Sequence, residues 1–365
     1  MHKLVKYVIY LMYIVLGSIC IRFIKIDPNI VIFGARGGMA FEGNSKYLFL
    51  SRQNVGPKRR VWIAKDTDVV DQVRAANCEA YHYLSFTGFI LSAKASSIFI
   101  THSMFDCAPL IWKKKQIVID LWHGVPIKKI SFSDKNLGVM NRIMDYYKSK
   151  RLNYLISHSK GYAEIYSQNM KISLDRIEFF GSPKIEALKK KTIVEVECLS
   201  VVAAVGKTYF YTPTFRDYNY DYPLLSAETL PKINAALSQS NSILLIKLHP
   251  SLLSVSIKNL SNVHFLDSSV DPYRIFPAVD ILISDYSSLL TDFKSIYPNK
   301  DIVVYAPDIA HYTNARGFNI DFHAAFDNIL TGDPLQVLTE KSNLKDLRLI
   351  SDHEKCCENI FRLLN

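Results

Sequence analysis

The stretch Ile281-Leu-Ile-Ser-Asp-Tyr-Ser-Ser-Leu-Leu-Thr-Asp-Phe293 joins a strand to a helix through a short polar turn. Its first four residues are mostly apolar, which predicts a buried parallel strand, and Leu289 begins a helical pattern. The carboxyl end of such a strand faces the ligand crevice of an open α/β sheet. Ser287 and Ser288 can cap the helix, and their hydroxyls with the nearby backbone N–H groups favour a phosphate. The alternative is an ordinary capped helix.

The same alternation of strand and helix runs along the whole chain. Short apolar runs predict strands at 30–33, 61–64, 97–100, 116–121, 154–159, 177–183, 209–211, 243–250, 281–284 and 302–305. Helical patterns lie between several of them, for example at 44–50 and 68–76. Strands separated by helices indicate parallel sheets, and 365 residues are long for a single core. We therefore expect an α/β protein with two Rossmann-like domains.

Four segments follow from this pattern. We expect a membrane-associating helix at residues 1–26, Rossmann-like domains at 27–190 and 200–335, and a C-terminal helix at 336–365 that packs back across the domains. The segment Lys184 to Cys198 is charged and irregular, which makes it the best linker candidate.

Composition limits the class of protein. With 49% hydrophobic and 21% charged residues, the chain can fold around a large core. The net charge of +10 is uneven, because residues 1–160 carry 24 Lys/Arg against 10 Asp/Glu, whereas residues 161–365 carry 20 against 24. The basic half should meet an anionic partner such as a membrane surface, a phosphorylated acceptor or nucleic acid. The six cysteines lack the spacing of a zinc site or a disulfide framework, so a reducing compartment fits best.

The amino terminus carries an apolar run from Tyr7 to Ile21 with basic residues on both sides. At 15 residues it is shorter than the roughly 20 that a spanning helix needs. It fits a signal peptide, a short membrane helix or a helix lying in the membrane interface. No small-residue cleavage site follows it, so we favour membrane attachment without secretion.

Two motifs in the first half are weak signals. Gly34-Ala-Arg-Gly-Gly38 follows a predicted strand, but the complete dinucleotide-binding fingerprint is absent. Asp66-Thr-Asp68 has the D-x-D spacing of metal-dependent sugar transferases, yet it stands where a helix N-cap belongs. We interpret it as a cap.

His123 is the strongest catalytic candidate in the first half. It stands at the carboxyl end of a predicted strand, where catalytic groups collect in α/β folds. Gly124 allows a close approach of backbone or ligand, and Pro126 fixes the turn. A histidine can also be purely structural, but this position favours catalysis. Lys128 and Lys129 add positive charge beside it.

In the second half, cations and hydroxyls follow successive strands. They are Thr214, Arg216, Lys247, His249, Ser287, Ser288 and Arg316. Because the carboxyl ends of parallel strands meet at one sheet edge, these groups should converge. Such a set suits a diphosphate, since positioned donors stabilise the charge that develops as a phosphoester bond breaks.

Six motifs, in this order, resemble those of the CDP-glycerol glycerophosphotransferase family, which contains teichoic-acid primases and polymerases and related capsule enzymes. They are His123-Gly-Val-Pro-Ile-Lys-Lys129, Gly181-Ser-Pro-Lys184, Tyr211-Thr-Pro-Thr-Phe-Arg-Asp217, Lys247-Leu-His-Pro250, Ile283-Ser-Asp-Tyr-Ser-Ser288 and Arg316-Gly-Phe318. The resemblance runs from about residue 30 to residue 330.

The resemblance implies a GT-B-like pair of domains, with the acceptor side in 27–190, the CDP-donor side in 200–335 and the active site in the cleft between them. It also implies transfer of a polyol phosphate from a CDP-linked donor to a lipid-linked glycan or polyol-phosphate acceptor, with release of CMP. The reaction would occur at the cytoplasmic face of a bacterial membrane, without a metal or other cofactor.

The family's functional residues map onto this chain by motif. His123 matches a proposed general base, and His249 matches a second essential histidine near the donor diphosphate. Ser287, Ser288 and Arg316 match donor phosphate contacts. Asp285 lies in the same motif as the two serines, and its role is open. A histidine with a pKa near 6.5 can accept a hydroxyl proton at neutral pH.

Two departures leave the substrate open. Val125 replaces the usual Thr after His-Gly, and the chain is closer in size to the primases than to the large polymerases. We expect the donor to be CDP-glycerol, CDP-ribitol or another activated donor. A GT-B glycosyltransferase that uses a nucleotide sugar is the second reading, because one fold hosts many reactions. A nucleic-acid-binding protein is the third, but the sequence shows no such motif, so nucleic acid is not an expected partner.

Overall fold

A computed structural model describes residues 12–51, 59–190, 206–248, 260–267, 270–346, 348 and 354–364. The described residues fall into two compact units. The first unit contains those within Met1–His123, Ile130–Ile193 and Ser351–Asn365, and the second contains Gly124–Lys129 and those within Val194–Ile350.

The first unit is built on a parallel sheet of seven strands among the described residues. The strands are β1 (Asp27–Phe33), β2 (Arg59–Ala64), β3 (Ala80–His82), β4 (Ala95–Ile100), β5 (Ile117–Asp120), β6 (Tyr154–Ile156) and β7 (Ile177–Glu178). Their order is β3-β2-β1-β4-β5-β6-β7. Because β1 and β4 are neighbours although β2 and β3 lie between them in sequence, the order reverses direction there.

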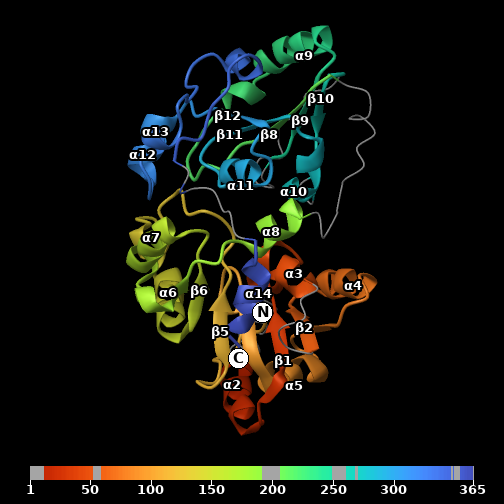
Figure 1. The fold of residues 1–365 in the computed structure, drawn as a ribbon, viewed down its shortest axis with the longest axis vertical. Helices are drawn as coiled ribbons and strands as arrows, with labels where there is room; N and C mark the ends of the chain where they lie inside the picture. The colour runs from red at the N-terminus through yellow and green to blue at the C-terminus, as the bar shows by residue number, and fades with distance from the viewer. Residues whose placement is uncertain are drawn as a thin grey trace, which may run out of the picture. The chain divides into compact units, whose positions relative to one another are not determined.

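The strands of this sheet are apolar because helices cover it. The last four residues of β1 are all buried, as expected for a strand with helices on both faces. Phe33 of β1 stacks on Phe99 of β4, with ring centroids 4.6 Å apart. Figure 1 shows the helices around the sheet. They are α3 (Gly43–Leu50), α4 (Thr67–Ala75), α5 (Phe86–Lys94), α6 (Val139–Arg151), α7 (Lys160–Met170) and α8 (Pro183–Lys189).

The C-terminal helix α14 (Cys356–Arg362) completes the core of the first unit. Cys356, Cys357, Ile360 and Phe361 are buried in the same apolar cluster as Val31 and Phe33 of β1. The backbone N–H of Cys357 also donates to Glu186 Oε2 of α8 at 2.8 Å. The helix predicted at 336–365 is therefore shorter in the structure, and it packs within the first unit (Figure 1).

The second unit contains a parallel sheet of five strands in its described part. The strands are β8 (Thr208–Thr212), β9 (Ile243–Ile246), β10 (Val263–Phe265), β11 (Ile281–Ser284) and β12 (Asp301–Val304), in the order β10-β9-β8-β11-β12. The helices are α9 (Thr229–Gln239), α10 (Pro272–Ile275), α11 (Leu289–Ile296), α12 (Ile309–Ala315) and α13 (Phe322–Ala325). The order reverses between β8 and β11.

The prediction of two parallel α/β units is confirmed. The ten predicted strands are all present, and Asp66 caps α4 by accepting a hydrogen bond from the Asp68 backbone N–H at 3.0 Å. The interpretation of residues 184–198 as irregular is wrong for its first part. Pro183 begins helix α8, Ser182 caps it, and α8 packs against α3.

The described part of the amino-terminal run is helical but irregular. It comprises a π-helical turn (η1, Tyr13–Gly17), α2 (Ser18–Cys20) and a 3₁₀ turn (η2, Ile21–Phe23). Residues 1–11 of the predicted membrane-associating helix lie outside the described residues. Within the part of the chain that the structure describes, no helix has both the length and the apolar character required to cross a membrane.

Replacing Gly34 tests the close packing after β1. A Cβ atom at this position would lie 2.2 Å from the backbone oxygen of Asp106. Backbone cannot swing aside as a side chain can, so Gly34→Ala should lower the free energy of unfolding by about 1–3 kcal/mol. Urea unfolding followed by circular dichroism measures this loss. Gly138→Ala is the matched control, because a Cβ there meets no atom within 4 Å. Equal stability of the two variants would contradict the described packing.

Candidate active site

The candidate residues of both units lie at the carboxyl ends of strands. In the first unit, the glycine turn after β1 and the segment Thr101–Asp106 after β4 stand at the reversal of strand order, and His123 follows the next strand, β5. In the second unit, Thr214 and Arg216 follow β8 and Asp285 follows β11. Ligands of open α/β sheets bind at such reversals.

Hydrogen bonds with Asn44 and Asp120 fix the backbone next to His123. Trp122, the residue before it, has a φ of 51°, in the left-handed region that residues other than glycine seldom adopt. The buried side chain of Asn44 donates to the carbonyl oxygens of Leu121 and Trp122 at 2.9 and 3.0 Å. Asp120 accepts from the Trp122 N–H at 2.8 Å. These bonds fix the turn that presents His123.

The His123 ring has one defined hydrogen-bond role. Its Nδ1 lies 3.0 Å from the carbonyl oxygen of Thr101. A carbonyl only accepts hydrogen bonds, so Nδ1 carries the proton and Nε2 is left as the basic nitrogen. The ring stacks on His102 and Trp122, with centroids at 4.1 and 4.4 Å.

Although part of the His123 side chain is exposed, its surroundings keep it neutral. Desolvation by the surrounding protein lowers its pKa well below the ordinary value, and His102 and Lys148 contribute in the same direction. Desolvation also lowers the pKa of His102 to about 4. A neutral imidazole at physiological pH is the form that accepts a proton.

Asp106 organises the loop beneath His123 and was missed in the sequence. It is fully buried, and its carboxylate accepts backbone N–H bonds from Gly37, Thr101 and His102, each at 2.8 Å, and from Ser103 at 3.1 Å. One side chain therefore links the turn after β1 to the turn after β4. No local sequence signal indicates this role, because the partners lie up to 69 residues away.

Lys148 of α6 is a second missed residue. It is buried, pairs with Asp120 at 2.5 Å and donates to the His102 carbonyl at 2.8 Å. Burial raises the pKa of Asp120 to about 6, although Lys148 opposes this. Through Asp120, which accepts the Trp122 N–H, Lys148 helps to fix the backbone next to His123.

The motif that begins at His123 continues into the second unit, where Gly124 packs against the segment 281–293. A Cβ atom on Gly124 would lie 2.6 Å from Ser288 Oγ. Asn319 Nδ2 donates to the carbonyls of Pro126 and Lys128 at 3.1 and 2.7 Å. Lys128 also pairs with Phe318 as an isolated β-bridge. Three motifs distant in sequence, beginning at His123, Ile283 and Arg316, thus meet through backbone contacts.

Asp285 is buried and organises the turn after β11. Its two carboxylate oxygens accept the Thr214 N–H at 3.0 and 3.1 Å, and Oδ1 accepts the Tyr286 N–H at 2.6 Å. It also pairs with Arg216 at 2.9 Å. The β8 and β11 loops are therefore tied together at the point where the sheet order reverses.

Arg216 is a buried structural cation. Its Nε and Nη2 bond the two oxygens of Asp308 at 2.7 and 2.9 Å, and Nη1 donates to the Thr214 carbonyl at 2.6 Å. Four tyrosine rings surround the guanidinium, those of Tyr220, Tyr222, Tyr286 and Tyr312. Burial alone would lower the pKa of Arg216, but Asp308 and Asp285 raise it well above the ordinary value. These contacts hold the guanidinium in place, and the direct contact of Arg216 with the donor stays a prediction.

The remaining predicted residues have partly exposed side chains. They are Thr214, Lys247, Ser287, Ser288 and Arg316. Ser287 Oγ accepts the Leu289 N–H at 3.2 Å, whereas Ser288 stands at the N-cap of α11 without a side-chain cap. Arg316 pairs with Asp217 at 3.1 Å. His249 lies outside the described residues.

The positive charge of Arg316 affects the pKa of Lys128. The sequence analysis noted only that Lys128 is positively charged. Desolvation and the positive charges of Arg316 and Arg216 lower its pKa to about 8, although Asp285 and Asp217 oppose them. A lysine held beside other cations gains most from an anionic ligand, because the ligand relieves their mutual repulsion.

Comparisons with known proteins agree with this architecture. The polymerase described as "Structure of the Wall Teichoic Acid Polymerase TagF" has a TM-score of 0.71 at 20% identity, over 100% of this chain and 97% of that one. A variant of it soaked with CDPG has a TM-score of 0.72. These define the class as a protein of two parallel α/β domains.

Curated relatives give the same result. A teichoic acid poly(glycerol phosphate) polymerase of Bacillus spizizenii is 25% identical over 374 residues, which cover 93% of this chain and 91% of the relative. A polymerase of the same name from Staphylococcus epidermidis is 22% identical over 88% of this chain, which spans only 46% of that relative. The family model for CDP-glycerol:poly(glycerophosphate) glycerophosphotransferase matches residues 18–346. The chain therefore belongs to the CDP-glycerol glycerophosphotransferase family.

Removing the buried guanidinium tests the role of Arg216. Arg216→Met leaves the Asp285 and Asp308 carboxylates buried without a cation, so we expect a loss of about 3–5 kcal/mol. Thermal unfolding at several pH values measures it. The deficit should shrink as the pH falls from 7 towards 4, because Arg216 lowers the pKa of Asp308 in the wild type and Asp308 therefore protonates more readily in the variant. Lys232→Met, which breaks an exposed pair with Glu228, is the control and should leave the melting temperature almost unchanged. An equal effect in both variants would contradict the described network.

Proposed function

We propose that this protein transfers a polyol phosphate, most simply glycerol phosphate, from a CDP-linked donor to a lipid-linked glycan or polyol-phosphate acceptor and releases CMP. The product is a teichoic-acid or capsule polymer, and the reaction takes place at the cytoplasmic face of the bacterial membrane. Membership of the family supports the reaction class. The observation that carries the proposal is a histidine whose basic nitrogen is defined by its hydrogen bond to Thr101.

His123 is the general base of the proposed reaction. Its Nε2 takes the proton of the acceptor hydroxyl, and the acceptor oxygen attacks the distal phosphorus of the donor diphosphate. A phosphorus–oxygen bond forms to the acceptor, and the bond between that phosphorus and the bridging oxygen breaks. CMP leaves with the electron pair of the broken bond. The stack on His102 and Trp122 restricts rotation of the base, which reduces the entropy cost of reaching the reactive geometry.

The donor diphosphate is held by residues of the second unit. Ser287 and Ser288 supply hydroxyls at the start of α11, where backbone N–H groups point outward. Lys128, Arg316 and Lys247 supply positive charge for an anionic ligand. The assignment of these residues is part of the proposal. His249 also stays a prediction as the second histidine of the site.

Three side chains position the loops of this donor site. They are those of Arg216, Asp285 and Asp308. None of them presents an open charged group, because each is bonded to the others or to backbone. Their effect on the ligand is indirect, through the position of the β8 and β11 loops. Preorganised loops lower the cost of ordering the site when the donor binds.

Donor choice is tested first by binding. The purified protein should be stabilised by CDP-glycerol or CDP-ribitol, and not by UDP-GlcNAc, in a thermal-shift experiment without added metal. A ligand present at 100 times its dissociation constant adds about 2.7 kcal/mol to the stability. The CDP-polyol that stabilises more strongly is the donor. Stabilisation by UDP-GlcNAc alone would replace this proposal with a glycosyltransferase.

The base is tested by His123→Ala. We expect CMP release with membranes as the acceptor source to fall by roughly 10²–10⁴-fold, whereas donor binding stays within a factor of about two, because the acceptor proton has lost its base. In the wild type, kcat should fall as the pH drops through the lowered pKa of His123, below 6.5. His323→Ala, which changes a histidine of α13, is the control. Unchanged turnover in His123→Ala would remove it from the base role.

The charge of Lys128 should appear in the pH dependence of donor binding. Lys128 loses its proton as the pH rises through about 8, so affinity for the CDP-polyol should weaken between pH 7 and 9.5. Lys128→Arg keeps its charge over this range and should flatten the profile, because arginine does not deprotonate there. Calorimetric titrations at several pH values measure the change, with Lys129→Arg as the neighbouring control. A wild-type affinity independent of pH would contradict this role.

A further inference from the structure

The amino-terminal helical segment exposes large apolar side chains of the kind that a helix normally buries. One side is docked on the first unit: Tyr13 Oη donates to the Tyr83 carbonyl at 2.8 Å, and Ser18 Oγ accepts the Ile111 N–H at 2.8 Å. The opposite side exposes large apolar residues. They are Met12, Val15, Leu16, Ile19 and Phe23, each about half exposed or more, with Phe23 at 87%. A helix that serves only the fold places such residues inward.

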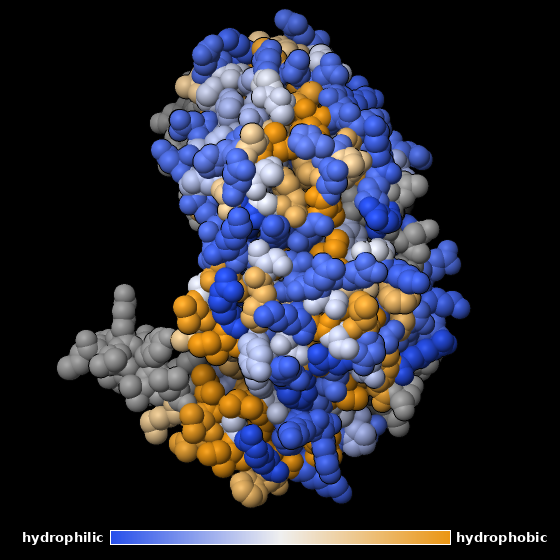
Figure 2. All heavy atoms as spheres, turned by 90° about the vertical axis from the view of Figure 1, so that its left-hand side faces the viewer, coloured by the Kyte–Doolittle hydropathy of each residue, from blue (hydrophilic) through white to orange (hydrophobic). Residues whose placement is uncertain are grey.

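Neighbouring residues enlarge this apolar face. The loop and first turn of α5, which contacts η2, expose Leu84 and Phe86, the latter at 81%. Figure 2 shows hydrophobic residues gathered on the surface of the first unit, with hydrophilic residues interspersed. Contiguous exposed apolar surface of this kind marks a site of association with a protein or a membrane.

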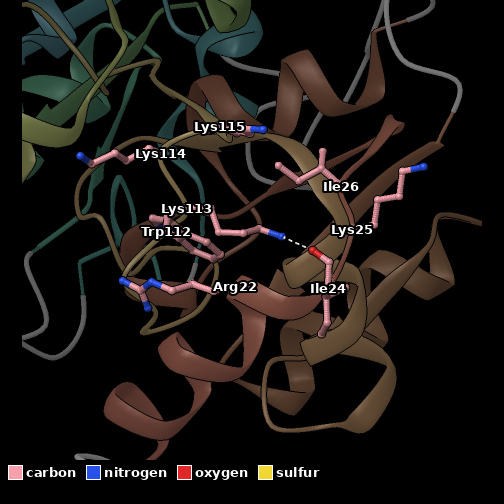
Figure 3. A pocket seen from close by; sticks show the side chains of 8 residues that line it. All are labelled: Arg22, Ile24, Lys25, Ile26, Trp112, Lys113, Lys114 and Lys115. Carbon is pink, nitrogen blue, oxygen red and sulfur yellow. Dashed lines mark hydrogen bonds between the residues drawn. The ribbon is translucent and has the colours of Figure 1, made fainter.

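A cationic pocket lies at the end of the same segment. It has a volume of about 610 Å³ and is lined by Arg22, Ile24, Lys25, Ile26, Trp112, Lys113, Lys114 and Lys115 (Figure 3). Five of these eight residues are cations and none is an acid. Lys113 crosses the pocket and donates to the Ile24 carbonyl at 2.9 Å, whereas Lys25 and Lys114 extend away from its centre (Figure 3). Aliphatic and aromatic walls with a cationic rim suit a ligand that is both apolar and anionic.

The positive surface continues to α6. Lys114 also lines an adjoining pocket of about 530 Å³ together with Lys150, Arg151 and Arg176, where Asp175 is the one acid among the lining residues. The amino-terminal part of α6 exposes a second apolar stripe, formed by Val139, Met140, Ile143 and Tyr146. Their spacing of one, three and three residues places them on one helix face.

We propose that this surface, formed by residues 12–23, Leu84, Phe86 and the pocket around Lys114, docks on a membrane and binds the phosphate of an anionic phospholipid. The exposed side chains enter the acyl boundary, and the cations meet the headgroups. The proposal makes specific the membrane location in the proposed function and rests on it.

The positive charge of this surface favours a membrane over a second copy of this chain as its partner. In a symmetric dimer through this face, both copies would bring the same cluster of cations together without an acid to offset it. An anionic bilayer supplies the opposite charge over the whole surface and accepts the apolar side chains at the same time. The bilayer therefore fits both observations.

Sedimentation of the full-length protein with vesicles tests the proposal. We expect binding to vesicles of phosphatidylcholine with 30% phosphatidylglycerol, weaker binding in 0.5 M NaCl, and at least tenfold weaker binding to phosphatidylcholine alone. The double variant Phe23→Ser/Phe86→Ser and the double variant Lys114→Glu/Lys115→Glu should each weaken binding to the anionic vesicles by about tenfold or more. Leu174→Ser and Lys232→Glu change an exposed apolar residue and an exposed cation elsewhere, and should bind as the wild type does.

Three outcomes would overturn the assignment. They are wild-type protein that stays in the supernatant, double variants that still sediment fully, and binding that depends on residues 1–11 but not on these side chains. Thermal stabilisation by free inorganic phosphate that disappears in Lys114→Glu/Lys115→Glu, without vesicle binding, would identify a soluble-anion site instead. Stabilisation by a CDP-polyol, measured without vesicles, should persist in all variants. Wild-type protein that is stabilised by the CDP-polyol but does not bind the vesicles would reject the docking surface and leave the proposed function standing.

Discussion

The pairing of Arg216 with Asp285 and Asp308 is the interaction on which the second unit depends. Two carboxylates and one guanidinium are buried together, and each alone would be costly to remove from water. Together they form a network that four tyrosine rings enclose. Because the network bonds the backbone after both β8 and β11, it helps to set the position of Ser287 and Ser288, the serines of the proposed donor site.

The first unit also buries a carboxylate, but there no cation among the described residues offsets the cost of removing it from water. Asp106 is equally buried, yet it is satisfied by four backbone N–H groups and the hydroxyl of Thr101, without a cation. Hydrogen bonds from several N–H groups offset the cost of removing a carboxylate from water. Nearby, Lys148 forms an ion pair with Asp120 and donates a hydrogen bond to the carbonyl of His102. The proposed base thus rests on buried polar groups that touch no substrate themselves.

The sequence predicted the large features because each has a local signal. Short apolar runs indicated ten of the strands, whereas β3 and β10, with three residues each and a histidine in both, gave too weak a pattern. Arg216 was assigned to the ligand because a cation after a strand has the same local pattern in both roles. What decides its role is Asp308, 92 residues away. Asp106 and Lys148 likewise depend on loops that only the folded chain brings together.

The position of α14 has a consequence for biosynthesis. Its cysteines, isoleucine and phenylalanine fill the core beside β1, so the core of the first unit is completed by a helix that lies more than 300 residues after β1 in sequence. The described strands and helices of the second unit all precede α14, so they leave the ribosome first. Until α14 has been synthesised, the apolar surface of the first sheet that it covers stays open to water, where it can bind chaperones or aggregate. The described elements of the second unit are therefore all available for folding before the core of the first unit can be completed.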